Sequence, residues 1–152
     1  MVTENDFEVE SMHYNRLLLR SMTMTTNHQK AFNYATTLAK VYGIPLGIVS
    51  VLETGDLNIY QSLSPDLLST RRAQMSEHLN TYVDKAEAFG ATDVQPLIGE
   101  GKPARVILED IAPEFRPDLI IIGSHTKHGR NRLGHVAAEI VREAECSVIV
   151  VR

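Results

Sequence analysis

Short continuous apolar runs alternate along the chain with apolar positions at helical spacing. The runs predict five strands buried on both faces, at residues 17–19, 46–52, 94–98, 119–122 and 148–151. Apolar residues that recur every three or four positions predict helices between these strands, at residues 32–42, 68–89, 104–115 and 137–144. Alternating strands and helices of these lengths predict an α/β fold.

The order of the elements predicts the architecture within that class. Strands joined by helical crossovers run parallel, so we expect a single doubly wound, mainly parallel five-stranded sheet with helices on both faces, Rossmann-like in type. The pair Ser64-Pro65 places a capping hydroxyl and a first-turn proline at the start of the second helix, and Gly90 closes it. Pro113 removes a backbone donor, so we expect the third helix to end or kink before it, leaving Phe115 in an irregular segment.

The chain is expected to form one domain, residues 14–152, behind a mobile acidic leader, residues 1–13. The leader has acidic residues where a secretory signal would need a basic region and an apolar stretch, and no apolar run reaches membrane-spanning length. The single cysteine, Cys146, cannot form an internal disulfide and favours a reduced compartment as a buried structural thiol. We therefore expect a cytoplasmic protein without a membrane partner.

Charge narrows the possible partners further. The net charge of −4 and the pI near 5.8 argue against a surface for nucleic acid or anionic lipid spread over the whole domain. The composition, with 43% hydrophobic and 22% charged residues, is that of an ordinary globular protein. Any cationic ligand-binding site must therefore be local.

Three turns at the carboxyl ends of strands are the candidate ligand-binding segments, because ligands of parallel sheets bind there. They are residues 20–26, 99–103 and 123–135. The third contains three glycines together with Lys127, Arg130 and Arg132, directly before a helix. Backbone amides, a helix start and cations are the groups that bind phosphate, although a solvated loop whose glycines only turn the chain has the same composition.

Metal binding and catalysis have little support in these turns. His125, His128 and His135 lie in one loop, but that loop contains no cysteine or carboxylate to complete a metal's ligand set. The chain also lacks a Walker-type loop, a nucleophile elbow and a zinc-protease pair. We expect no metal site and no enzymatic activity.

Several segments together resemble the universal stress protein family. The segments are Tyr14 to Leu19, Ala31 to Gly43, Gly101 to Pro103, Pro117 to His125, Leu133 to Ala137 and Cys146 to Arg152. The resemblance covers nearly all of residues 14–152. It implies a cytoplasmic homodimer, often paired through the last strand (here Val148, Ile149, Val150 and Val151), with ATP or a related adenine nucleotide bound in one branch and none in another.

For the nucleotide-binding branch, the resemblance implies a loop motif of Gly-x-x-Gly, nine further residues, and then Gly followed by Ser or Thr. Here Gly123 matches the first glycine, Thr126 replaces the second, and seven residues separate Thr126 from Gly134. His135 stands where the resemblance implies a phosphate-binding hydroxyl, and Met22 stands where it implies an acidic residue after the first strand. The resemblance therefore predicts that conventional ATP binding is weakened or absent.

Other positions still agree with a nucleotide pocket. Val51 and Gly101 match positions that line it in the family. A second hypothesis is that Lys127, Arg130, Arg132 and His135 rebuild an anion site from side-chain charge. The candidate ligand-binding residues are Ser21, Met22, Val51, Gly101, Gly123, Ser124, Lys127, Arg130, Gly134, His135 and Val136.

The sequence thus predicts a dimeric regulatory or stress-response protein with no firmly assigned cofactor. The alternatives are a family member that binds ATP or AMP and, third, a weak ATPase. The third alternative lacks an acidic residue in the obvious place to coordinate magnesium.

Overall fold

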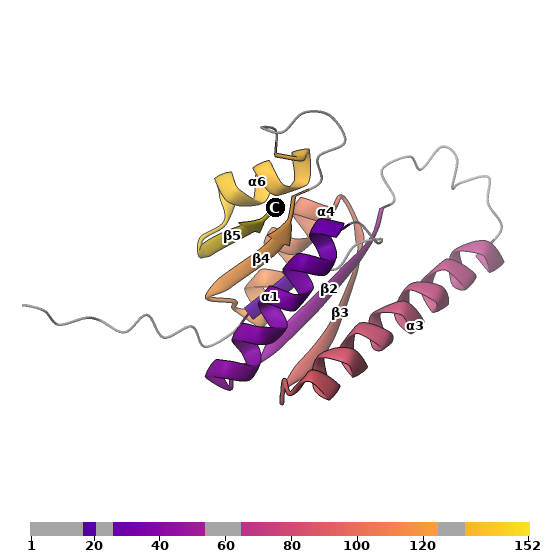
Figure 1. Cartoon of the computed structure of the whole chain (residues 1–152). Helices are drawn as coiled ribbons and strands as arrows, with labels where there is room; N and C mark the ends of the chain where they lie inside the picture. Colours follow the sequence, from indigo (N-terminus) through magenta and orange to yellow (C-terminus); the bar gives the residue numbers. More distant parts are fainter. Residues whose placement is uncertain (1–16, 21–25, 54–64, 125–132) are drawn as a thin grey trace, which may run out of the picture.

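The computed structural model describes residues 17–20, 26–53, 65–124 and 133–152 (Figure 1). The expected acidic leader lies outside the described residues. Within the described part of the chain, no helix is both long enough and apolar enough to cross a membrane.

The described strands form one sheet in the order β3-β2-β1-β4-β5. All four neighbouring pairs are parallel, which confirms the predicted fold class. The strands are β1 (Leu17–Arg20), β2 (Leu46–Glu53), β3 (Val94–Gly101), β4 (Leu119–Gly123) and β5 (Ser147–Val151). Strand order reverses between β1 and β4, so the edge beyond their carboxyl ends is where a ligand of such a sheet binds.

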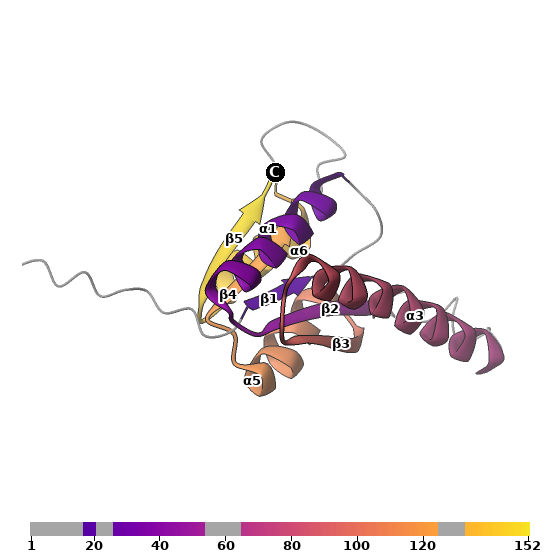
Figure 2. The ribbon, with the colours of Figure 1, turned by 60° about the horizontal axis from the view of Figure 1, so that its bottom comes forward.

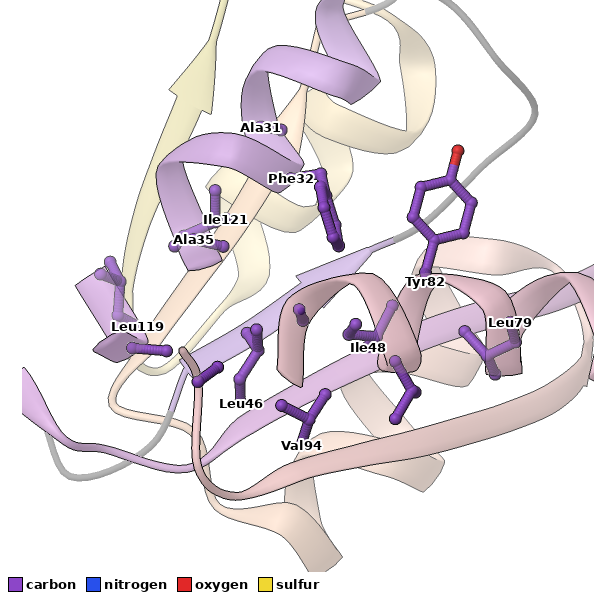
Figure 3. Close-up of a cluster of buried hydrophobic side chains, with 14 residues drawn as sticks. Ala31, Phe32, Ala35, Leu46, Ile48, Leu79, Tyr82, Val94, Leu119 and Ile121 are labelled. Atoms are coloured by element: carbon purple, nitrogen blue, oxygen red, sulfur yellow. The ribbon is translucent and has the colours of Figure 1, made fainter. Parts of the chain in front are cut away.

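Two long helices cover one face of the sheet, α1 (Thr26–Tyr42) and α3 (Pro65–Phe89). Figure 3 shows Phe32 of α1 and Tyr82 of α3 above the strands, with ring centroids 5.1 Å apart in an edge-on arrangement. The strands contribute the apolar side chains beneath these helices, among them Leu46, Ile48, Leu119 and Ile121.

Shorter helices cover the opposite face of the sheet. They are α4 (Pro103–Arg105), η2 (Val106–Ile111), α5 (Ala112–Phe115) and α6 (His135–Glu143). Their apolar side chains pack on the alternate residues of the same strands, such as Val49, Ile120 and Ile122. Because neighbouring strand residues serve opposite faces, β4 is buried along its whole length.

The prediction for Pro113 is wrong. The chain stays helical through it: η2 is a π-helical segment, the Ala112 N–H donates to Ile107 O, and Pro113 sits in the first turn of α5. Phe115 is therefore a buried helical residue. The wider π-helical turns before the proline absorb it without breaking the helical path, and the helix ends at Arg116, whose φ is 52°.

The α3 helix begins at Pro65 and ends before Gly90, as predicted. Its buried side chains all lie in its second half, and its first half projects beyond the sheet (Figure 2). Arg72 on the exposed part forms an ion pair with Glu100 of β3, including a hydrogen bond from Nη2 to Oε2 of 3.0 Å. Hydrogen bonding from the Arg72 guanidinium lowers the pKa of Glu100.

Candidate functional site

The described candidate residues gather at the carboxyl edge of the sheet. Val51 lies near the end of β2, Gly101 ends β3, and Gly123 ends β4. Strands β2 and β4 flank β1, whose last residue, Arg20, pairs with Val49. The structure therefore brings these positions to one edge, as expected from the parallel strands.

Four of the candidate residues lie outside the described residues: Ser21, Met22, Lys127 and Arg130. The same is true of Arg132, and of His125 and His128, for which no metal site was expected. The hypothesis of an anion site rebuilt from loop cations therefore stays a prediction.

The segment at residues 99–103 differs from its prediction as a turn. The strand continues through Gly101, because Val51 to Glu53 of β2 pair with Gly99 to Gly101. Gly101 has a φ of +135°, which favours glycine. The connection to α4 is a single residue, Lys102, followed by the predicted proline at the helix start. This short connection fixes the end of β3 against the next helix.

Ser124, directly after β4, contributes to the sheet. Its N–H donates to Val151 O at 2.9 Å, and the residue is 2% exposed. That backbone donor is therefore engaged with β5.

The start of α6 is the feature of this edge best suited to an anion. Gly134 is the N-cap residue and provides no side-chain hydrogen bond, and the first helical bond runs from the Ala138 N–H to Gly134 O at 2.9 Å. The first-turn amides of a helix lack intrahelical acceptors and lie at the positive end of its dipole. His135 is exposed beside them, whereas Val136 is half-buried against the core. His135 is therefore the candidate side chain of α6 that can reach a ligand.

Cys146 lies at the amino end of β5, away from the carboxyl ends of the strands, and is half-buried rather than buried. Burial raises the pKa of its thiol, and the nearby Asp118 raises it further. A thiol with a raised pKa is a poor nucleophile near neutral pH. Among the described residues, no group of three or more histidine, cysteine or acidic side chains could hold a metal ion.

Sequence reasoning missed two hollows away from the carboxyl edge. One, of about 660 Å³, lies beside Cys146, Asp118 and Arg116. The other, of about 400 Å³, lies between α1 and α3. Both are lined by residues far apart in the sequence, so no local pattern signals them.

Comparisons with known proteins agree with the fold described above. The model of the universal stress protein family matches residues 23–152. A protein of Staphylococcus haemolyticus and one of Staphylococcus aureus strain USA300, both named as universal stress proteins, are each 32% identical over 124 residues, which is 80% of this chain and 75% of theirs.

Solved structures of the same family share the fold. A universal stress protein from Lactobacillus plantarum superposes with a TM-score of 0.75 at 23% identity, covering 91% of this chain and 98% of its own. A universal stress protein in complex with cAMP has a TM-score of 0.65 at 25% identity, covering 91% and 97%. One from Archaeoglobus fulgidus in complex with dAMP has a TM-score of 0.67 at 20% identity, covering 91% and 98%. This chain belongs to the universal stress protein family.

Proposed function

We propose that this protein is a cytoplasmic, dimeric regulator of the stress response in which conventional ATP binding is weakened or absent. The start of α6 carries this proposal. It presents Gly134 and His135, with no side-chain cap, at the place where nucleotide-binding members are expected to have a hydroxyl for a phosphate. The first-turn amides and the exposed His135 imidazole then face the ligand, without that hydroxyl.

The missing hydroxyl and the missing acidic residue would each contribute substantially to the free energy of nucleotide binding. A hydrogen bond to a charged group contributes about 1.5–3 kcal/mol, so the loss of one phosphate-binding hydroxyl weakens binding roughly 10- to 100-fold. The Ser124 N–H, engaged with Val151 O, does not compensate for it. The loss of an acidic residue at Met22 removes a second contact, to the adenine or ribose.

Binding of an adenine nucleotide is the second candidate function. The relative solved with cAMP is 25% identical to this chain, and the first-turn amides of α6 still favour a phosphate. This candidate makes ATP or AMP the ligand. Slow hydrolysis of ATP is a third candidate and requires that ATP bind first.

Calorimetric titration separates these candidates. We expect ATP, AMP and cAMP, each with and without magnesium, to bind more weakly than about 100 μM, because each lost polar contact costs about tenfold or more in affinity. A dissociation constant in the low micromolar range would overturn the proposal in favour of nucleotide binding. Release of phosphate from ATP, measured in the same samples, would instead support the enzyme.

The position of β5 supports the proposed dimer. It is an edge strand of the sheet. Val151 directs its carbonyl to β4, where it accepts from Ser124. Successive residues of a strand direct their backbone groups to opposite edges, so Val148 and Val150 present theirs to the open edge. An unpaired edge of this kind is a template for pairing with a second copy.

The opposite edge is blocked by a proline. Asp93 O accepts from the Leu46 N–H of β2, so the alternate residues Pro96 and Ile98 of β3 face outwards. Proline has no backbone N–H to donate and is placed on edge strands for that reason. Strand pairing between two copies is therefore favoured at β5 and disfavoured at β3.

Replacing Val150 with proline is expected to convert the dimer to a monomer. The substitution removes a backbone donor from the open edge and keeps the groups that bond to β4. Sedimentation equilibrium at micromolar concentration measures the result. Ile98→Pro makes the same change on the opposite edge and is expected to leave the dimer intact. A wild-type protein that sediments only as a monomer would contradict the proposed dimer.

A further inference from the structure

A groove between α1 and α3 lies on the face of the sheet away from the α6 start. It has a volume of about 400 Å³ and is lined by Phe32, Asn33 and Thr36 of α1 and by Lys85 and Phe89 of α3. Ligand sites of small molecules begin at roughly 300 Å³ and combine apolar walls with a few polar groups. The groove has this composition.

Thr36 is the unusual member of the lining. It is 1% exposed, and its Oγ1 has no hydrogen-bond partner among the described residues. A buried hydroxyl without a partner is costly, about 1–3 kcal/mol. A buried hydroxyl of this kind is expected to meet an ordered water or a bound ligand.

Other threonines on these helices behave differently. Thr37, Thr70 and Thr81 each donate from Oγ1 to the carbonyl four residues earlier, at 2.7, 2.8 and 3.1 Å. The same bond is open in principle to Thr36, with the carbonyl of Phe32, and Thr36 does not make it. The Thr36 hydroxyl is therefore available for a partner in the groove.

The groove also has a defined charge. Among its lining residues Lys85 carries a positive charge, and none is a carboxylate. The Lys85 ammonium lies 5.5 Å from the centre of the Tyr82 ring, and the Lys40 ammonium lies 5.0 Å from the centre of the Phe89 ring. These cations are held against aromatic faces beside the groove, so an anionic group is favoured there.

We propose that the groove between α1 and α3 binds a small amphipathic monocarboxylate. Its apolar body lies between the Phe32 and Phe89 rings. Its carboxylate accepts a hydrogen bond from the buried hydroxyl of Thr36 and pairs with the Lys85 ammonium. This site is separate from the edge at α6, and it does not depend on nucleotide binding.

Calorimetric titration of the full-length protein with octanoate tests this site. We expect octanoate to bind with a dissociation constant on the order of 100 μM, as efficient contacts of a ligand this small allow. We expect 1-octanol, which keeps the apolar body and lacks the charge, to bind at least about tenfold more weakly. Equal affinity for the two probes, or no heat with 5 mM octanoate (roughly fifty times the expected constant), overturns the proposal.

Two variants locate the binding within the groove. Thr36→Val replaces the hydroxyl by a methyl group of similar size, and Lys85→Gln removes the charge from an exposed position. Each is expected to weaken octanoate binding about 3- to 10-fold. Lys102→Gln removes an exposed lysine outside the groove and is expected to leave the affinity within about twofold. If Thr36→Val and Lys85→Gln both bind like the wild type, the proposal is wrong.

Discussion

Gly99→Ala is expected to lower the free energy of unfolding by about 3 kcal/mol, near the upper end of the cost of overpacking a core. A Cβ atom at this position of β3 would overlap Cγ1 of Val106. Val106 is 4% exposed and begins η2. Only Lys102 separates β3 from α4, so the short connection prevents the helix from moving away. Urea denaturation at 25 °C measures the loss.

Two further variants give this prediction its controls. Gly43 has a φ of +62°, and no atom lies within 4 Å of a Cβ placed there. Gly43→Ala is therefore expected to lower the free energy of unfolding through backbone strain alone, by about 1 kcal/mol. Val106→Ala removes the overlapping methyl group. In the Gly99→Ala background it is expected to cost less than in the wild type, giving a coupling energy of about 1 kcal/mol or more. A Gly99→Ala protein within about 0.5 kcal/mol of the wild type, the usual range of neutral surface changes, contradicts the overlap.

The strands and most helices follow from the sequence because burial imposes short-range patterns. A strand covered on both faces, such as β4, has to be apolar at every position, and Ser64-Pro65 signals a helix start through local backbone chemistry. Two boundaries were predicted wrongly, one because of a distant contact and one because of an unusual helical geometry. Gly99 to Gly101 indicate a turn locally, but their pairing with β2 makes them a strand. Pro113 indicates a helix end, but the preceding π-helical turns continue the helix.

The candidate site shows the same division. Parallel strands bring their carboxyl ends to one edge, so the positions of Val51, Gly101 and Gly123 could be predicted from the sequence. The roles of individual side chains could not. Thr36 and Thr37 are neighbours of one residue type, yet only Thr37 bonds to its helix carbonyl. Thr36 is buried and Thr37 is exposed, and the helices that line the groove beside Thr36 meet through residues about fifty positions apart in the chain.

Restoring the family's expected ligand groups is expected to raise the affinity for ATP. His135→Ser places a hydroxyl in the first turn of α6, where serine suits a helix start and a phosphate. Because His135 is exposed, the change leaves the core intact. One charge-assisted hydrogen bond predicts a gain of roughly 10-fold or more. Adding Met22→Asp, which supplies the acidic residue that the resemblance implies, is expected to increase the gain further.

His135→Ala is the matched control for this gain, because it removes the imidazole without adding a hydroxyl. If the hydroxyl is the missing group, His135→Ser binds ATP more tightly than His135→Ala in calorimetric titration, and His135→Ala binds no better than the wild type. Equal affinity of the serine and alanine variants, with both tighter than the wild type, would show that the imidazole only obstructs the phosphate. A loss of affinity in both would show that His135 itself binds the ligand, as in an anion site built from side-chain charge. The sign of these two changes therefore separates a lost phosphate site from a rebuilt one.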